Sequence, residues 1–274
     1  MRTIIVPTDF SPNALYAASY AADLANMIGA RLELVHVYDL PAAVSEIPVS
    51  YPIEDIEAEI QSQLTQLKEK LSTRTAGRIP IKTTIMQGEV INEVNKYCES
   101  VQPYAIVVGA ESAGPIKRLM FGGRTLTATN TLSWPVIIVP PYTLFRNIRK
   151  IGLACDFRDV VETVRVQEIK EIVKEFKADL HVLHISDGEN DSIDPKTVEE
   201  SALLEEMLGD LNPIYHFLHE PDIDKGIRDY VQQNKLDLLI IIPKKHGLID
   251  KIFHHSHSKD LVLHAPLPIL SLHE

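Results

Sequence analysis

RTIIVPTDFS at residues 2–11 and RKIGLACDFR at residues 149–158 are two copies of one short apolar run that ends in Asp-Phe. The aspartates of the two runs, Asp9 and Asp156, lie 147 positions apart. LVHVYD at 34–39 returns at almost the same spacing as VLHISD at 182–187, and WPVIIVP at 134–140 returns as LPILSLH at 267–273. This internal repeat predicts two similar domains, residues 1–142 and 147–274, and the first is about fifteen residues longer in its middle.

The composition excludes several classes of protein. With 274 residues, of which 45% are hydrophobic, the chain can bury two cores of ordinary size. Its net charge of −11 argues against nucleic acid as a partner, because binding to phosphates needs a basic surface. The chain has no run of eighteen apolar residues and no signal peptide, which predicts a cytoplasmic protein without a membrane partner. Cys98 and Cys155 offer neither a disulfide framework nor metal-site spacing.

Apolar runs rich in Ile, Val and Leu alternate with segments of helical periodicity along both copies. In the first copy the pattern predicts strands at 2–7, 31–37, 81–86, 104–108 and 134–139, with helices from Pro12 to Gly29 and at 54–71, 90–100 and 126–132. In the second copy it predicts strands at 149–154, 179–185, 214–218, 237–242 and 267–272, with helices at 160–176, 196–209 and 224–234. This alternation predicts an α/β protein with two doubly wound domains, each built on a five-stranded parallel sheet.

In such sheets, ligands bind beyond the carboxyl ends of the strands, where the strand order reverses. The candidate sites are therefore the turns after the first and fourth strands, residues 7–11 with 109–125 in the first copy and 154–158 with 242–258 in the second. Gly122, Gly123, Arg124 and Thr125 precede a predicted helix and are typical of a phosphate cradle, although glycines before a helix are also ordinary turn residues. Asp9 has two readings of equal weight, a hydrogen-bond acceptor for a ligand or a cap for the adjacent helix.

The first copy resembles the universal stress protein family. The resemblance rests on IVPTDFS at 5–11 with its alanine-rich helix, LVHV at 34–37, the segment from Val107 through Gly122, and WPVIIVP at 134–140. Because the likeness covers both halves, the chain resembles a tandem member with a Rossmann-like, adenine nucleotide alpha hydrolase-like fold. The resemblance implies a stress-response protein that binds ATP, AMP or ADP, with or without Mg²⁺. The implied nucleotide-binding residues are Pro7, Thr8, Asp9, Val37, Gly109, Ser112, Gly122, Gly123, Arg124 and Thr125.

The first copy departs from the family pattern at two of these positions. Ser112 replaces a glycine, and Gly123 replaces a hydroxyl residue that donates to a phosphate. The lost bond is worth about 0.5–1.5 kcal/mol, which weakens binding roughly tenfold without abolishing it. Thr125 and Arg124 are the candidates to compensate.

The second copy departs further. Ile242, Lys245, His255 and Ser256 stand opposite Gly109, Ser112, Gly122 and Gly123. The side chains of Lys245 and His255 would occupy space that phosphates need, so we expect no ATP binding of the family's kind in this half.

Other readings stay open beside a nucleotide-binding regulatory module. One is a scaffold that binds no nucleotide, with both loops degenerate. Another is a zinc enzyme that uses His246, His254, His255 and His257, against which a solvated or anion-facing loop is the simpler account. The chain contains no nucleophile elbow and no Walker lysine motif, so we predict no catalytic residues and at most slow ATP hydrolysis.

Two expectations concern assembly and access. By analogy with the family, residues 136–139 and 269–272 would pair as antiparallel edge strands within the chain, which leaves a homodimer and unidentified protein partners open. Residues 41–60 are either a lid over the nucleotide or a plain surface connection.

Overall fold

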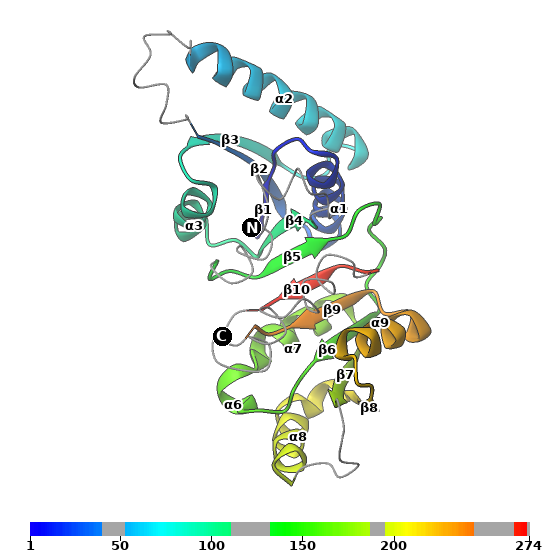
Figure 1. The fold of residues 1–274 in the computed structure, drawn as a ribbon. Helices are drawn as coiled ribbons and strands as arrows, with labels where there is room; N and C mark the ends of the chain where they lie inside the picture. Colours follow the sequence, from blue (N-terminus) through cyan, green and yellow to red (C-terminus); the bar gives the residue numbers. More distant parts are fainter. Residues whose placement is uncertain (40–52, 111–131, 187–194, 244–265, 273–274) are drawn as a thin grey trace. The chain divides into compact units, whose positions relative to one another are not determined.

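The computed structural model describes residues 1–39, 53–110, 132–186, 195–243 and 266–272, drawn in colour in Figure 1. The described residues fall into two compact units that divide between Phe145 and Arg146. No helix among the described residues is long and apolar enough to cross a membrane.

The first unit is a five-stranded parallel sheet covered by helices. Its elements in chain order are β1 (Thr3–Pro7), α1 (Pro12–Ile28), β2 (Arg31–Tyr38), α2 (Ile53–Arg74), β3 (Ile81–Gln87), α3 (Val90–Val101), β4 (Ala105–Gly109) and β5 (Val136–Val139). The strands lie in the order β3-β2-β1-β4-β5, and each neighbouring pair is parallel. The order reverses at β1, which has β2 on one side and β4 on the other. The carboxyl ends of β1 and β4 are therefore the switch point where ligands bind in such sheets.

The second unit repeats this plan. Its elements are β6 (Lys150–Ala154), α6 (Val160–Thr163), α7 (Val166–Phe176), β7 (Asp179–Ser186), α8 (Pro195–Leu208), the 3₁₀ helix η2 (Gly209–Leu211), β8 (Ile214–His219), α9 (Ile223–Asn234), β9 (Leu238–Ile241) and β10 (Ile269–Ser271). The parallel order β10-β9-β6-β7-β8 reverses at β6. The two predicted doubly wound sheets are therefore confirmed, while the predicted antiparallel pairing of the last strands stays a prediction.

The strand registers define which residues of the two units correspond. In the first unit Ile4 lies opposite Ala105, and in the second Ile151 lies opposite Leu238. These pairs are shifted by 147 and 133 positions, the same shifts that the sequence repeat shows. Counting on from Leu238, Ile242 is the structural counterpart of Gly109.

α1 shows how the sequence forms the cover of the first sheet. Ser11 caps the helix, since its Oγ accepts a hydrogen bond from the amide of Ala14 at 3.3 Å, and Gly29 ends it in a left-handed conformation at φ 66°. The residues that the helix buries are mostly alanines, namely Ala14, Ala17, Ala18, Ala21, Ala22 and Ala25, with Tyr20 and Leu24. Small side chains allow the helix axis to lie close to the sheet, whose central strand β1 is buried on both faces.

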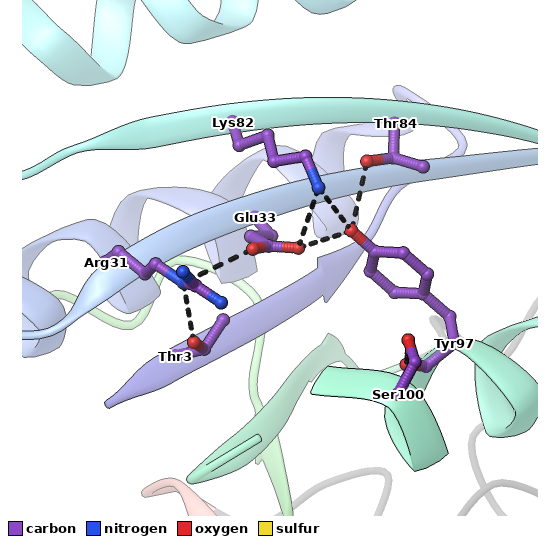
Figure 2. Close-up of polar contacts among 7 residues, drawn as sticks. All are labelled: Thr3, Arg31, Glu33, Lys82, Thr84, Tyr97 and Ser100. Carbon is purple, nitrogen blue, oxygen red and sulfur yellow. Dashed lines mark hydrogen bonds and ion pairs between the residues drawn. The ribbon is translucent and has the colours of Figure 1, made fainter. Parts of the chain in front are cut away.

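One charged group is buried inside the first unit. Glu33 of β2 is 1% exposed and faces α3, where its Oε2 accepts a hydrogen bond of 2.5 Å from the hydroxyl of Tyr97. Figure 2 shows the carboxylate between Tyr97 and two cations, Arg31 at 3.3 Å and Lys82 at 4.0 Å. The buried charge is thus compensated on both oxygens, as a carboxylate in a protein interior requires.

The predicted helix 160–176 is wrong in one respect, because the structure divides it into α6 and α7. Val164 is extended at φ −81° and ψ 121°, and its buried side chain holds that conformation. The segment is rich in valine, whose branched side chain weakens helices. The predicted helix 126–132 lies outside the described residues.

Candidate functional site

The turn after β1 is built by short-range hydrogen bonds of the Thr8-Asp9-Phe10 sequence. The amide of Thr8 continues the sheet by donating to the carbonyl of Val35 at 2.9 Å. The amide of Phe10 then donates to Thr8 Oγ1 at 3.1 Å, and the amide of Ser11 donates to Asp9 Oδ1 at 3.0 Å. Phe10 adopts a left-handed conformation, φ 61°, which is uncommon for a residue of its size and has to be held by its neighbours.

His36 of β2 holds this turn from the side. Its Nδ1 lies 2.7 Å from the carbonyl oxygen of Thr8 and must carry the proton, because a carbonyl only accepts. The imidazole also stacks on Phe10, with ring centroids 4.8 Å apart and planes 17° apart. His36 aligns with His184 in the repeat, but no role in the site was predicted for it. In both copies a histidine follows Asp-Phe after nearly the same number of residues, and this recurrence is the signal from which its contact with the turn could have been predicted.

The end of β4 meets the start of α1 at Gly109. A Cβ at this position would lie 2.5 Å from the backbone carbonyl oxygen of Asn13, which no side chain tolerates. Asn13 also donates from Nδ2 to the carbonyl of Ala110 at 2.8 Å. Gly109 therefore allows the first turn of α1 to touch the end of β4, a role that the sequence analysis did not assign. Asn13, which it also missed, fastens the contact.

These contacts bring half of the predicted site residues to one edge. Pro7 ends β1 and Thr8 follows it. Gly109 ends β4 beside them, and Val37 lies near the end of the neighbouring β2. Thr8 is buried, Pro7, Val37 and Gly109 are half-buried, and Asp9 is exposed. Both earlier readings of Asp9 fit the structure, because Oδ1 accepts from the amide of Ser11 at the helix start while the exposed carboxylate has a second oxygen for a ligand.

The other predicted residues lie outside the described part of the chain. They are Ser112, Gly122, Gly123, Arg124 and Thr125 of the phosphate loop, and His246, His254, His255 and His257 of the zinc hypothesis. Most of the segment 41–60, the suggested lid, is outside it as well. Within the described ranges, no three His, Cys, Asp or Glu side chains are placed to hold a metal ion.

The second unit keeps the same turn with different surroundings. The amide of Arg158 donates to Asp156 Oδ1 at 3.2 Å, and His184 Nδ1 lies 3.1 Å from the carbonyl oxygen of Cys155. Phe157 is left-handed at φ 50° like Phe10, but it is only 1% exposed and packs against Phe217 at 5.6 Å between ring centroids. Aromatic side chains therefore cover the turn in this unit.

The start of α6 is occupied by a side chain of the protein itself. The carboxylate of Glu200, from α8, accepts a hydrogen bond from the amide of Val160 at 2.8 Å. Val160 corresponds to Asn13, so this carboxylate sits where the first unit brings α1 against β4. A negative charge at this place repels an incoming phosphate, and it uses an amide that an anion would need.

Comparison with known proteins places the chain in a family. The model of the universal stress protein family matches residues 1–140 and again residues 147–273. A universal stress protein of Methanocaldococcus jannaschii is 24% identical over 144 residues, which cover 50% of this chain and 81% of that protein.

Solved structures show the same fold over nearly the whole length. A universal stress protein from Archaeoglobus fulgidus superposes with a TM-score of 0.74 at 18% identity, covering 99% of this chain and 96% of its own. A protein from Pseudomonas aeruginosa PAO1 reaches a TM-score of 0.58 at 16% identity, covering 100% of this chain and 92% of its own. The chain therefore belongs to the universal stress protein family and carries two of its domains in tandem.

Proposed function

We propose that the first unit binds an adenine nucleotide, ATP or its relatives AMP and ADP, at the carboxyl edge formed by β1, β2 and β4. In this proposal the second unit is a partner domain that does not bind ATP in the same manner. The observation that carries the proposal is Gly109, which ends β4 without a side chain beside the exposed Asp9, at the point where the strand order reverses. This is the position at which doubly wound sheets take their ligands.

The described residues fit the nucleoside end of such a ligand. Asp9 offers an exposed carboxylate oxygen to a ribose hydroxyl or an adenine amino group. Val37 adds a half-buried apolar wall, and Gly109 adds backbone without a side chain. Because Gly109 also draws the first turn of α1 toward the edge, the positive end of that helix dipole favours the negative charge of the phosphates. The phosphates themselves are assigned to Gly122, Gly123, Arg124 and Thr125 on the family resemblance.

Calorimetric titration of the full chain with ATP, ADP and AMP, with and without Mg²⁺, tests the proposal. We expect Asp9→Asn to weaken binding roughly tenfold, because the amide keeps an acceptor for Ser11 but offers the ligand one acceptor fewer and no charge. Asp156→Asn is the matched control in the second unit and should leave the affinity unchanged. Absence of binding heat from the wild type, or equal affinity of wild type and Asp9→Asn, would contradict the site.

The alternative of a scaffold without nucleotide is supported in the first unit by the departures from the family pattern at Ser112 and Gly123. In the second unit it is supported by Glu200 and Phe157, which lie at the edge. A mass spectrum of ligand released from the purified protein separates the two readings for the whole chain. An adenine nucleotide in stoichiometric amount supports binding by the first unit. A protein that carries none and takes up none supports the scaffold.

A further inference from the structure

A pair of histidines, the buried His181 and the half-buried His216, lies beneath α9 in the second unit. Nδ1 of His181, on β7, lies 3.2 Å from Nε2 of His216, on β8, and 3.0 Å from the hydroxyl of Tyr230, on α9. The two imidazoles are nearly parallel, with planes 13° apart and centroids 5.4 Å apart. His181 and Tyr230 are each 7% exposed. The three side chains therefore form one polar contact between α9 and the sheet.

The same place in the first unit holds the carboxylate network of Figure 2. Glu33 lies opposite Lys82, and His181 lies opposite Ile214, so the strand registers make Glu33 the counterpart of His181 and Thr84 that of His216. Tyr97 on α3 corresponds to Tyr230 on α9, since both helices have twelve residues and start at equivalent positions. Each unit therefore fastens a helix by a tyrosine hydroxyl, to a carboxylate in one case and to an imidazole pair in the other.

The imidazole pair is satisfied only at low proton occupancy. When both rings are neutral, the one lone pair on Nδ1 of His181 accepts from Nε2–H of His216 or from the hydroxyl of Tyr230, and no positive charge lies between the rings. A first proton can be shared between the facing nitrogens. A second proton puts N–H groups and positive charges on both nitrogens, so the rings repel each other across the 3.2 Å gap and the Tyr230 hydroxyl is left as the acceptor for Nδ1–H of His181.

We propose that protonation of the His181–His216 pair weakens the packing of α9 on β7 and β8, which makes the second unit the acid-responsive half of the chain. The proposal does not depend on nucleotide binding. It concerns residues on the sheet face under α9, away from the β6 turn.

All but one of the influences on the pair lower the pKa values of its two histidines. Burial, the neighbouring His216 and Lys150 of β6 lower the pKa of His181, while Asp179 opposes them, and burial lowers the pKa of His216. Lys150 is itself fixed to α9, since its Nζ donates to the carbonyl of Asn234 at 3.1 Å. The helix also buries Asp224 together with Tyr230. The two contacts from the strands to α9 are therefore coupled, since Lys150, which bonds Asn234, also lowers the pKa of His181, which bonds Tyr230.

The sign of the pH effect follows from these shifts. The unfolded chain takes up protons on histidine near pH 6.5, whereas the folded pair takes them up only at lower pH. The stability that the neutral pair confers is complete above pH 6.5 and is lost as the pH falls through that value toward the lowered pKa values. The first unit has no imidazole at the equivalent positions, and histidine is the side chain that ordinarily changes charge between pH 5 and 8.

Hydrogen exchange of the full chain at pH 7.5 and pH 5.5, corrected for the intrinsic rates, tests the proposal. We expect the protection of α9 amides to fall about tenfold on acidification relative to the matched α3 amides in the same sample. His216→Gln should remove this difference, because glutamine does not titrate. His219→Gln, an exposed histidine on the same strand, is the control and should leave the difference intact.

An NMR titration of the wild-type histidines keeps the proposal testable if His216→Gln fails to fold. Values for His181 and His216 below 6.5 support it. The proposal is overturned if either value lies at or above 6.5, if α9 and α3 respond equally to acid, or if folded His216→Gln keeps the wild-type response.

Discussion

The two units have the same sheet topology but differ in the residue at the carboxyl end of the fourth strand, where Gly109 and Ile242 are equivalent. In the first unit this residue is Gly109, and the unbroken seventeen-residue helix α1 touches the strand end at Asn13. In the second it is Ile242, which is 3% exposed, and the corresponding helix is divided into α6 and α7. A single Cβ thus decides how closely a helix can approach the edge where ligands bind. In the first unit, a side chain at this position would not allow the close approach of α1.

The comparison also shows which features do not mark a binding site. The Asp-Phe turn, its left-handed phenylalanine and its histidine are present in both units with nearly the same hydrogen bonds. Their recurrence is therefore explained by the geometry of the turn. The survival of Asp156 is no evidence for a second nucleotide site, and the surroundings of the turn have to carry that distinction.

Gly109→Ala should have the largest effect, because it puts a side chain where the two units differ. The added Cβ would meet the backbone oxygen of Asn13 at 2.5 Å, and backbone cannot rotate away, so we expect a loss of about 3 kcal/mol in the free energy of unfolding of the first unit. Nucleotide affinity should fall with it, because α1 has to move. Urea denaturation followed by ligand titration measures both.

Ile242→Val serves as the control for that experiment. It shortens a buried side chain without touching a close backbone contact and should cost about 1 kcal/mol in the second unit alone. Equal stability of Gly109→Ala and wild type would show that the close contact is not needed.

Tyr97→Phe and Tyr230→Phe compare how much each tyrosine hydroxyl stabilises its own unit. Tyr97 donates to a carboxylate at 2.5 Å, and bonds to charged groups are the stronger class, so its removal should cost about 2 kcal/mol. Tyr230 bonds a neutral imidazole at 3.0 Å, and its removal should cost about 1 kcal/mol. Denaturant unfolding of both variants gives the two values, and a larger loss for Tyr230→Phe would contradict this order.

Ser11→Ala gives the smallest effect of the series. Ser11 caps α1 at the amide of Ala14, and the loss of such a cap costs about 1 kcal/mol. Arg158 stands at the same position of the second unit, where α6 has no side-chain cap from its N-cap residue Asp159. Arg158→Ala should therefore change the midpoint of thermal unfolding by less than Ser11→Ala does. Equal shifts of the unfolding midpoint in the two variants would show that the Ser11 cap does not distinguish the units.

The repeat and the apolar patterns predicted the sheets well for identifiable reasons. Strands such as β1 and β4 are continuous apolar runs bounded by charged or turn residues, which fixes their position within a residue or two. Ser11, Pro12 and Gly29 mark both ends of α1. The alternation of strands and helices then leaves few topologies to consider.

The sequence could not reveal features that depend on residues distant in the chain. No proline or glycine marks the break at Val164 between α6 and α7. The role of Asn13 needs the end of β4 beside it, and the cap of α6 by Glu200 spans forty residues. Glu33 lies among buried apolar residues of β2, and two of its partners, Lys82 and Tyr97, come from β3 and α3 and are brought to it only in the folded chain.

The division of α6 from α7 bears on whether the edge of one unit could be built into the other. Glycine at position 242 alone would leave a gap where a buried isoleucine stands, and the amide of Val160 would still bond Glu200. Rebuilding the edge of the first unit in the second would therefore need changes in the strand, the helix and α8 together. Substitutions coupled in this way are not additive, so no single one of them converts one edge into the other.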